Sequence, residues 1–95
     1  MLFLGTYSVK LENLETAMAK RLEWDDVAPE TFKIIAEYTV HGKPPPFSGV
    51  MIFETQDLSD VNFLIMYFGT SAEWDIRPCS NVLETIAMTR RHLAT

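Results

Sequence analysis

The order in which apolar periodicity changes along the chain limits the possible folds more than any other feature of the sequence. Four short segments have the composition of β-strands: residues 1–9, 31–42, 47–55 and 73–79. Three segments carry apolar residues at helical spacing: residues 13–24, 57–69 and 82–93. The sequence therefore predicts the order strand, helix, strand, strand, helix, strand, helix.

Residues 31–42 alternate between apolar and polar side chains. One parity holds Phe32, Ile34, Ala36, Tyr38 and Val40. The other holds Lys33, Glu37, Thr39 and His41, with Ile35 as the exception. Alternation of this kind is typical of a strand with one buried face, so we expect the first set to face a core. The following segment, FSGVMIFET, is apolar on both parities, which predicts a strand covered on both sides.

Residues 57–69 are compatible with a strand or a helix, because Val, Phe, Ile and Tyr favour strands. Asp57 as a cap, Asp60 in the first turn and Gly69 as a C-terminal stop favour the helix. The side chains of this helix are apolar on nearly all of its sides. We therefore expect it to be covered on two sides, which one sheet cannot do.

This order predicts a single ferredoxin-like α+β domain over residues 1–95, with a β-α-β-β-α-β antiparallel sheet plus a C-terminal helix. Right-handed crossovers place the first two helices on one face of the sheet. The opposite face has no helix of its own. Its simplest cover is a second copy, so we predict a homodimer in which two sheets face each other as a dimeric α+β barrel.

The stretch GKPPPF lies between the second and third predicted strands. Three consecutive prolines, Pro44–Pro46, remove three N–H donors and favour an extended polyproline conformation. We predict a rigid arm at a sheet edge, which packs on a partner or over a cavity mouth and discourages strand addition. The alternative, a docking peptide for a domain that binds PxxP motifs, lacks a free flexible tail.

Charge and cysteine content exclude several classes of protein. The net charge is −5, and eight Lys and Arg are scattered among thirteen acids, which disfavours nucleic acid as a partner. The basic cluster Arg90-Arg91-His92 instead suits the C-terminal end of a helix dipole. One cysteine, Cys79, cannot form an intrachain disulfide, and no apolar run approaches a membrane span. We expect a cytoplasmic protein without contact to a membrane.

Three stretches, MLFLGTYSV, PETFKII and EWDIRPC, resemble a family of short prokaryotic proteins described only as a domain of unknown function. The resemblance covers nearly the whole chain and implies the dimeric α+β-barrel type of ferredoxin-like fold. It implies no established reaction and carries no catalytic residue. The HGKPPP stretch departs from the shorter, glycine-rich turn expected there, and the tail after Cys79 is longer and more helical.

Polar residues of the predicted strands form one candidate site. They are Thr6, Ser8, Glu37, Thr39, His41, Glu54, Asp75 and Arg77. Near two carboxylates, His41 could act as a general base, and Arg77 could hold a carboxylate or an enolate. The alternative is that Glu37 pairs with Lys33 or Arg77 on a solvated edge and that His41 merely ends a strand.

Aromatic side chains form the second candidate site. A ligand-binding set of Tyr7, Glu37, Tyr38, Glu54 and Trp74 could line a cavity for a planar ligand, and Trp24 could join it. The commoner use of such residues is packing in a core or a dimer interface. Cys79, just before a helix N-terminus and close to Arg77 in sequence, could be a reactive thiolate or a small buried hydrophobe.

We expect no metal and no cofactor. Glu37 and His41 share a strand face but lie about 13 Å apart at strand rise, too far to chelate one ion together with Glu54. The sequence contains no glycine-rich phosphate loop, no G-x-S-x-G and no HExxH motif.

Three functions follow from these observations. The first is a homodimer that binds an apolar or aromatic small molecule between the sheets. The second is a cofactor-independent isomerase or monooxygenase of small organic acids, with His41 as base and Arg77 as anchor. The third is a structural or protein-interaction dimer that uses the proline arm.

Overall fold

The computed structural model describes residues 1–42 and 47–94. The predicted rigid arm Pro44–Pro46 lies outside these residues. The elements follow in the order β1 (Leu2–Val9), α1 (Leu14–Val27), β2 (Lys33–Val40), β3 (Phe47–Glu54), α2 (Leu58–Phe68), β4 (Glu73–Cys79) and α3 (Val82–Ala94). Short 3₁₀ turns, Leu11–Asn13 and Gly69–Ser71, precede α1 and follow α2. The predicted order of elements is confirmed.

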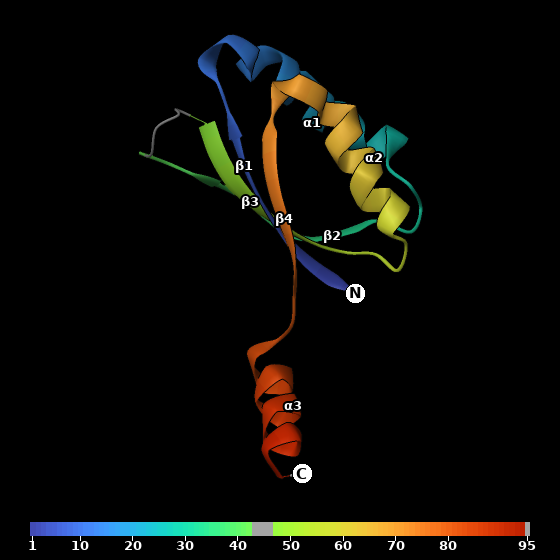
Figure 1. The fold of residues 1–95 in the computed structure, drawn as a ribbon. Helices are drawn as coiled ribbons and strands as arrows, with labels where there is room; N and C mark the ends of the chain where they lie inside the picture. The colour runs from blue at the N-terminus through green and yellow to red at the C-terminus, as the bar shows by residue number, and fades with distance from the viewer. Residues whose placement is uncertain (43–46, 95) are drawn as a thin grey trace.

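The four strands form one antiparallel sheet in the order β2-β3-β1-β4. The helices α1 and α2 lie on the same face of this sheet (Figure 1). This is the ferredoxin-like arrangement, with β1 and β3 inside and β2 and β4 at the edges. We call the face opposite α1 and α2 the open face.

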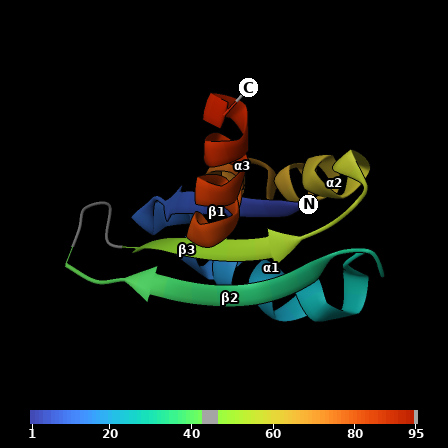
Figure 2. The same cartoon turned by 90° about the horizontal axis from the view of Figure 1, so that it is seen from below.

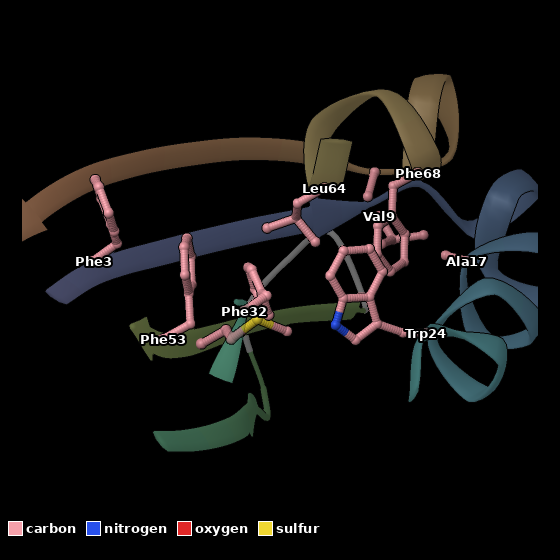
Figure 3. Close-up of a cluster of buried hydrophobic side chains, with 10 residues drawn as sticks. Phe3, Val9, Ala17, Trp24, Phe32, Phe53, Leu64 and Phe68 are labelled. Carbon is pink, nitrogen blue, oxygen red and sulfur yellow. The ribbon is translucent and has the colours of Figure 1, made fainter. Parts of the chain in front are cut away.

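The core lies between the sheet and the two helices (Figure 3). Trp24 of α1 is 1% exposed, and its ring centroid lies 5.0 Å from that of Phe32. Phe32 stacks on Phe53 at 4.5 Å, and Phe53 stacks on Phe3 at 5.3 Å. A continuous row of aromatic rings therefore joins α1 to the centre of the sheet.

A β-bulge in β2 overturns the predicted buried face of that strand. Ile34 lies opposite Phe53, but the next paired residue, Ala36, lies opposite Ile52, so Ile35 is an extra residue. Directly opposed residues share a side of the sheet. Ile34 therefore faces the helices with the fully buried Phe53. After the bulge, each side chain of β2 points to the face opposite to the one that the alternation predicts.

The reversal exchanges the two predicted faces of β2. Ala36, Tyr38 and Val40, which we expected to be buried, lie on the open face with Ile52 and Val50. Glu37 and Thr39, which we expected on the more polar side, lie on the helix-covered face. The prediction that Phe32 and Ile34 face the core is correct.

The predicted ends of α2 are confirmed. Asp57 accepts a hydrogen bond from the Ser59 backbone N–H at 2.9 Å, and Gly69 ends the helix with φ of 57°. One side of α2 is buried through Leu64 and Phe68, while Met66 on another side is 79% exposed. The described residues of the chain thus cover α2 on one side only.

The helix α3 projects away from the end of β4 and covers neither face of the sheet (Figures 1 and 2). Asn81 caps it, because its Oδ1 accepts a hydrogen bond from the Leu83 N–H at 2.8 Å. By contrast, Asn13 precedes α1 without capping it, and its side chain donates to the Thr70 carbonyl. None of the helices in residues 1–42 and 47–94 is long and apolar enough to cross a membrane.

Candidate functional site

A cavity of about 250 Å³ lies between α1 and the helix-covered face of the sheet. The strands contribute Tyr7, Phe47 and Trp74 to its lining, and α1 contributes Met18 and Arg21. Most of the lining is apolar, with one charged pair. A concave, mostly apolar space with few polar groups is the usual form of a small-molecule site.

Two glycines leave room for aromatic rings close to the sheet backbone, and these rings form the floor of this cavity. A Cβ atom at Gly5 would lie 3.1 Å from Cζ3 of Trp74. A Cβ atom at Gly49 would lie 2.5 Å from Cζ of Tyr7 and 2.6 Å from the Tyr38 carbonyl oxygen. The two rings are neighbours, with centroids 5.0 Å apart and planes inclined at 49°. The floor is therefore built from two glycine–aromatic pairs, Gly5–Trp74 and Gly49–Tyr7.

One wall of the cavity carries an ion pair between α1 and β2. Arg21 donates from Nε and Nη2 to the two carboxylate oxygens of Glu37, both at 2.7 Å. Arg21 also lies 3.6 Å from the exposed Asp25 carboxylate. The β-bulge explains this geometry, because it turns Glu37 toward α1. The alternative that Glu37 pairs with Lys33 or Arg77 is wrong.

Burial and charge perturb the titratable groups around the floor. Burial, and after it the negative charge of Glu37, raise the pKa of the Tyr7 hydroxyl above its ordinary value. The hydrogen bonds to Glu37 raise the pKa of Arg21. Tyr7 is therefore a neutral hydroxyl at physiological pH. Among the described residues, the buried indole Nε1–H of Trp74 has no hydrogen-bond partner.

The structure divides the predicted site residues into two groups. Tyr7, Glu37 and Trp74 come together around the cavity. Glu54, Tyr38 and Arg77 lie on the open face, because they are paired there with residues of that side. Tyr38 is 65% exposed. The two sets lie on opposite sides of one sheet.

The proposed catalytic residues His41 and Arg77 are not brought together within one chain. His41 follows the last residue of β2, while Arg77 lies in β4 at the other edge of the sheet. Three strand spacings of about 4.8 Å each separate these two strands. Arg77 donates from Nε to the Asp75 carboxylate at 3.2 Å, and both side chains are exposed.

Several features of the site escaped the sequence analysis. Arg21 and Met18 were not selected, because only the docking of α1 brings them to the sheet. Gly5 and Gly49 did carry a signal, since glycine within a strand often marks close approach by another group. In residues 1–42 and 47–94 no group of three or more His, Cys, Asp or Glu side chains is placed to hold a metal ion. Cys79, half-buried, ends β4.

Similarity to solved structures is low in sequence. Over 82% of its length the chain is similar to a formyltetrahydrofolate deformylase from Pseudomonas putida KT2440, with 7% identity and a TM-score of 0.49, and it spans 28% of that protein. It is similar over 85% of its length to 92% of a dimeric ferredoxin-like protein from an uncultured marine organism, with 17% identity and a TM-score of 0.48. A third similar structure is SnoaB, a cofactor-independent oxygenase from Streptomyces nogalater, with 13% identity and a TM-score of 0.45 over 86% of this chain and 94% of that one.

Sequence comparison with curated proteins finds no significant match. A family model, in contrast, matches residues 1–93, which is nearly the entire chain. This agrees with the resemblance carried by the first strand, the start of β2 and β4. The chain belongs to the family described as Domain of unknown function (DUF3303).

Proposed function

We propose that this protein binds a small, planar, apolar molecule in the cavity between α1 and the sheet. The observation that carries this proposal is the floor of Tyr7 and Trp74, two neighbouring rings that approach the sheet backbone closely at Gly49 and Gly5. A planar guest can stack on one of these two rings. A volume of about 250 Å³ suits a molecule of one or two rings.

The charged pair at the wall favours a neutral guest. Arg21 and Glu37 satisfy each other through two hydrogen bonds, so an anionic guest would have to displace Glu37 from Arg21. Removing one partner of a half-buried pair leaves the other charge unsatisfied, which costs free energy. The neutral Tyr7 hydroxyl, beside Thr39, instead offers its O–H as a donor to a weakly polar group.

The proposal also includes assembly and location. A second copy of the chain would cover the open face, whose apolar residues Tyr38 and Val40 are 65% and 39% exposed. Such a dimer could hold a further guest between its sheets. A single cysteine in 95 residues supports a reducing compartment such as the cytoplasm. The net charge of −5 argues against nucleic acid as a partner.

Binding is favoured over catalysis by the position of the proposed catalytic residues. An isomerase or monooxygenase with His41 as base and Arg77 as anchor requires both side chains in one site. Within one protomer they belong to opposite edges of the sheet. The third alternative, a purely structural dimer, does not account for the cavity between α1 and the sheet.

The test is a fluorescence titration with 2-naphthol, a neutral two-ring probe. We expect saturable binding to the wild-type protein and at least ~10-fold weaker binding to Ala17→Leu, because the longer side chain fills the cavity that the buried Ala17 lines. The matched control is Ala19→Leu, which makes the same change at an exposed position of α1 and should bind as the wild type does. Circular dichroism verifies that both variants are folded.

Two outcomes would contradict the binding site. One is the absence of saturable binding to the wild type. The other is equal binding by Ala17→Leu and the wild type. A thermal-shift measurement with the same probe on His41→Ala addresses the alternative function: unchanged stabilisation removes His41 from the site, and loss of stabilisation would support the catalytic alternative.

A further inference from the structure

The helix α3 is a folded element without a partner in its own protomer. Every residue from Val82 to Ala94 is exposed. Its connection to β4 consists of Ser80 and Asn81, and the cap by Asn81 sets the start of the helix. An isolated helix of 13 residues is marginal in water, so most of its stability has to come from packing.

One side of α3 is apolar. Val82, Ile86 and Leu93 follow one another at i, i+4 and i+11, a spacing that places them on the same side of a helix. They are 70%, 43% and 78% exposed. Met88 lies on the opposite side, near Glu84 and Arg91. The apolar side of α3 is therefore a surface that requires a cover.

The open face of the sheet is the second uncovered apolar surface. Leu4 and Val40 are 37% and 39% exposed, and Tyr38 is 65% exposed. Val50 and Ile52 of β3 lie between them and are partly buried. In Figure 1 α3 leads away from this sheet rather than over it. Neither surface is covered by residues 1–42 or 47–94 of the chain to which it belongs.

The size of the protomer indicates how much surface a partner would cover. Its accessible surface is 6836 Å², whereas a compact monomer of 10.9 kDa exposes about 5,600 Å². The radius of gyration is 15.5 Å, against about 12.4 Å for a compact chain of this length. The excess surface, roughly 1,200 Å², exceeds the ~800 Å² that each partner contributes to an interface of standard size.

Charges on the two surfaces are complementary. On the open face, β4 carries the exposed Glu73, Asp75 and Arg77; Asp75 is paired with Arg77, which leaves Glu73 as the acidic group available to a partner. The last turns of α3 carry the exposed Arg90, which borders the apolar side, whereas Arg91 lies on the opposite side of the helix. Opposite charges favour the approach of α3 to the open face of another copy and help to set its direction.

We propose that α3 of one copy packs its apolar side on the open face of a second copy, and that the second copy returns its own α3 in the same way. A two-fold symmetric exchange covers both uncovered surfaces with one contact made twice. This inference rests on the second copy suggested under the proposed function, but it places α3 rather than the partner's sheet on the open face. It is independent of ligand binding in the cavity between α1 and the sheet.

The first test is sedimentation analysis over a range of concentrations. We expect the wild type to have the mass of two chains, and the double variant Ile86→Asp with Leu93→Asp to dissociate at least ~100-fold more readily, because two buried apolar side chains become charges. The matched control, Met88→Asp, places the charge on the opposite side of α3 and should remain a dimer. Since α3 is exposed in the protomer, circular dichroism should show the sheet and its two covering helices intact in all variants.

A cross-link tests the receptor surface. In a Cys79→Ser background, Ile86→Cys combined with Val50→Cys should form a disulfide between chains on oxidation, whereas Met88→Cys with Val50→Cys should not. A wild type with the mass of one chain at ~100 μM would overturn both the dimer and the exchange. A dimer that survives the two Asp substitutions, or one without the Ile86–Val50 cross-link, would overturn the exchange and leave the dimer standing.

Discussion

At the scale of single residues, the two strand glycines decide whether the cavity has a floor. The Tyr7 ring lies over Gly49, and the Trp74 ring lies over Gly5. A side chain at either glycine would occupy the space of the ring. The effect of adding one methyl group should therefore depend on how closely each ring approaches.

We predict that Gly49→Ala lowers the free energy of unfolding by about 1–3 kcal/mol, because the new methyl group would meet both Tyr7 and the Tyr38 carbonyl. Gly5→Ala should cost less, since its nearest neighbours are Trp74 ring atoms at 3.1 and 3.2 Å. Urea unfolding measures both. A larger loss for Gly5→Ala would contradict the geometry of the floor.

A second prediction concerns Tyr7 at alkaline pH. Its pKa is raised, first by burial and then by Glu37, so the folded state keeps a proton that the unfolded chain releases near pH ~10. The stability from this proton is present below the unfolded pKa and is lost as pH rises through the folded pKa. Tyr7→Phe should therefore lose less stability than the wild type between about pH 9 and pH 11.

Urea unfolding at several pH values tests this prediction. Tyr38→Phe is the control, because Tyr38 is 65% exposed on the other side of the sheet. It should follow the wild-type profile. Identical pH profiles for Tyr7→Phe and the wild type would show that Tyr7 is not the source of the stability lost at alkaline pH.

Part of the site was predictable from residue type and part was not. The residue types of Tyr7, Glu37 and Trp74 predict lining of a cavity between two sheets, whereas the structure places them around a different cavity, between α1 and the sheet. Arg21 belongs to a helix surface that looks solvated in the sequence. Its role depends on where α1 docks and on the bulge that presents Glu37, and both are tertiary effects.

At the scale of elements, the β-bulge separates what periodicity could predict from what it could not. The order of strands and helices, the caps of α2 and α3 and the ferredoxin-like arrangement all follow local patterns. The face of β2 does not, because one extra residue reverses every side chain after it. Ile35, the single exception to the alternation, marked the position of the bulge.

The docking of α1 on the sheet depends chiefly on Trp24. This side chain is 1% exposed and contacts rings from the segment before β2 and from α2. We predict that Trp24→Ala lowers the free energy of unfolding by about 3–5 kcal/mol. Leu22→Ala, at a position of the same helix that is 81% exposed, should change it by less than about 0.5 kcal/mol. Comparable losses from the two substitutions would contradict this account.

At the scale of the whole molecule, helices cover one face of the sheet, and the described residues leave the other face exposed. If α3 gains its stability from a second copy, its backbone amides should exchange with deuterium at rates that depend on protein concentration. We predict fast exchange over residues 82–94 in dilute solution and protection at high concentration, whereas β1 and β3 stay protected throughout. Mass spectrometry of peptides measures this, and protection of α3 that is independent of concentration would contradict it.

The glycine–aromatic floor also restricts how a scaffold of this kind can diversify. The rings of Trp74 and Tyr7 leave no room for a side chain at Gly5 or Gly49. Substitution of these two glycines therefore cannot reshape the floor of the cavity without moving a ring. A relative that binds a larger ligand would carry a smaller side chain at position 7 or 74. A relative that binds a smaller ligand would carry longer α1 side chains facing the cavity. Ligand selectivity would thus evolve through the α1 side chains and the rings at positions 7 and 74, while the glycines at positions 5 and 49 stay unchanged.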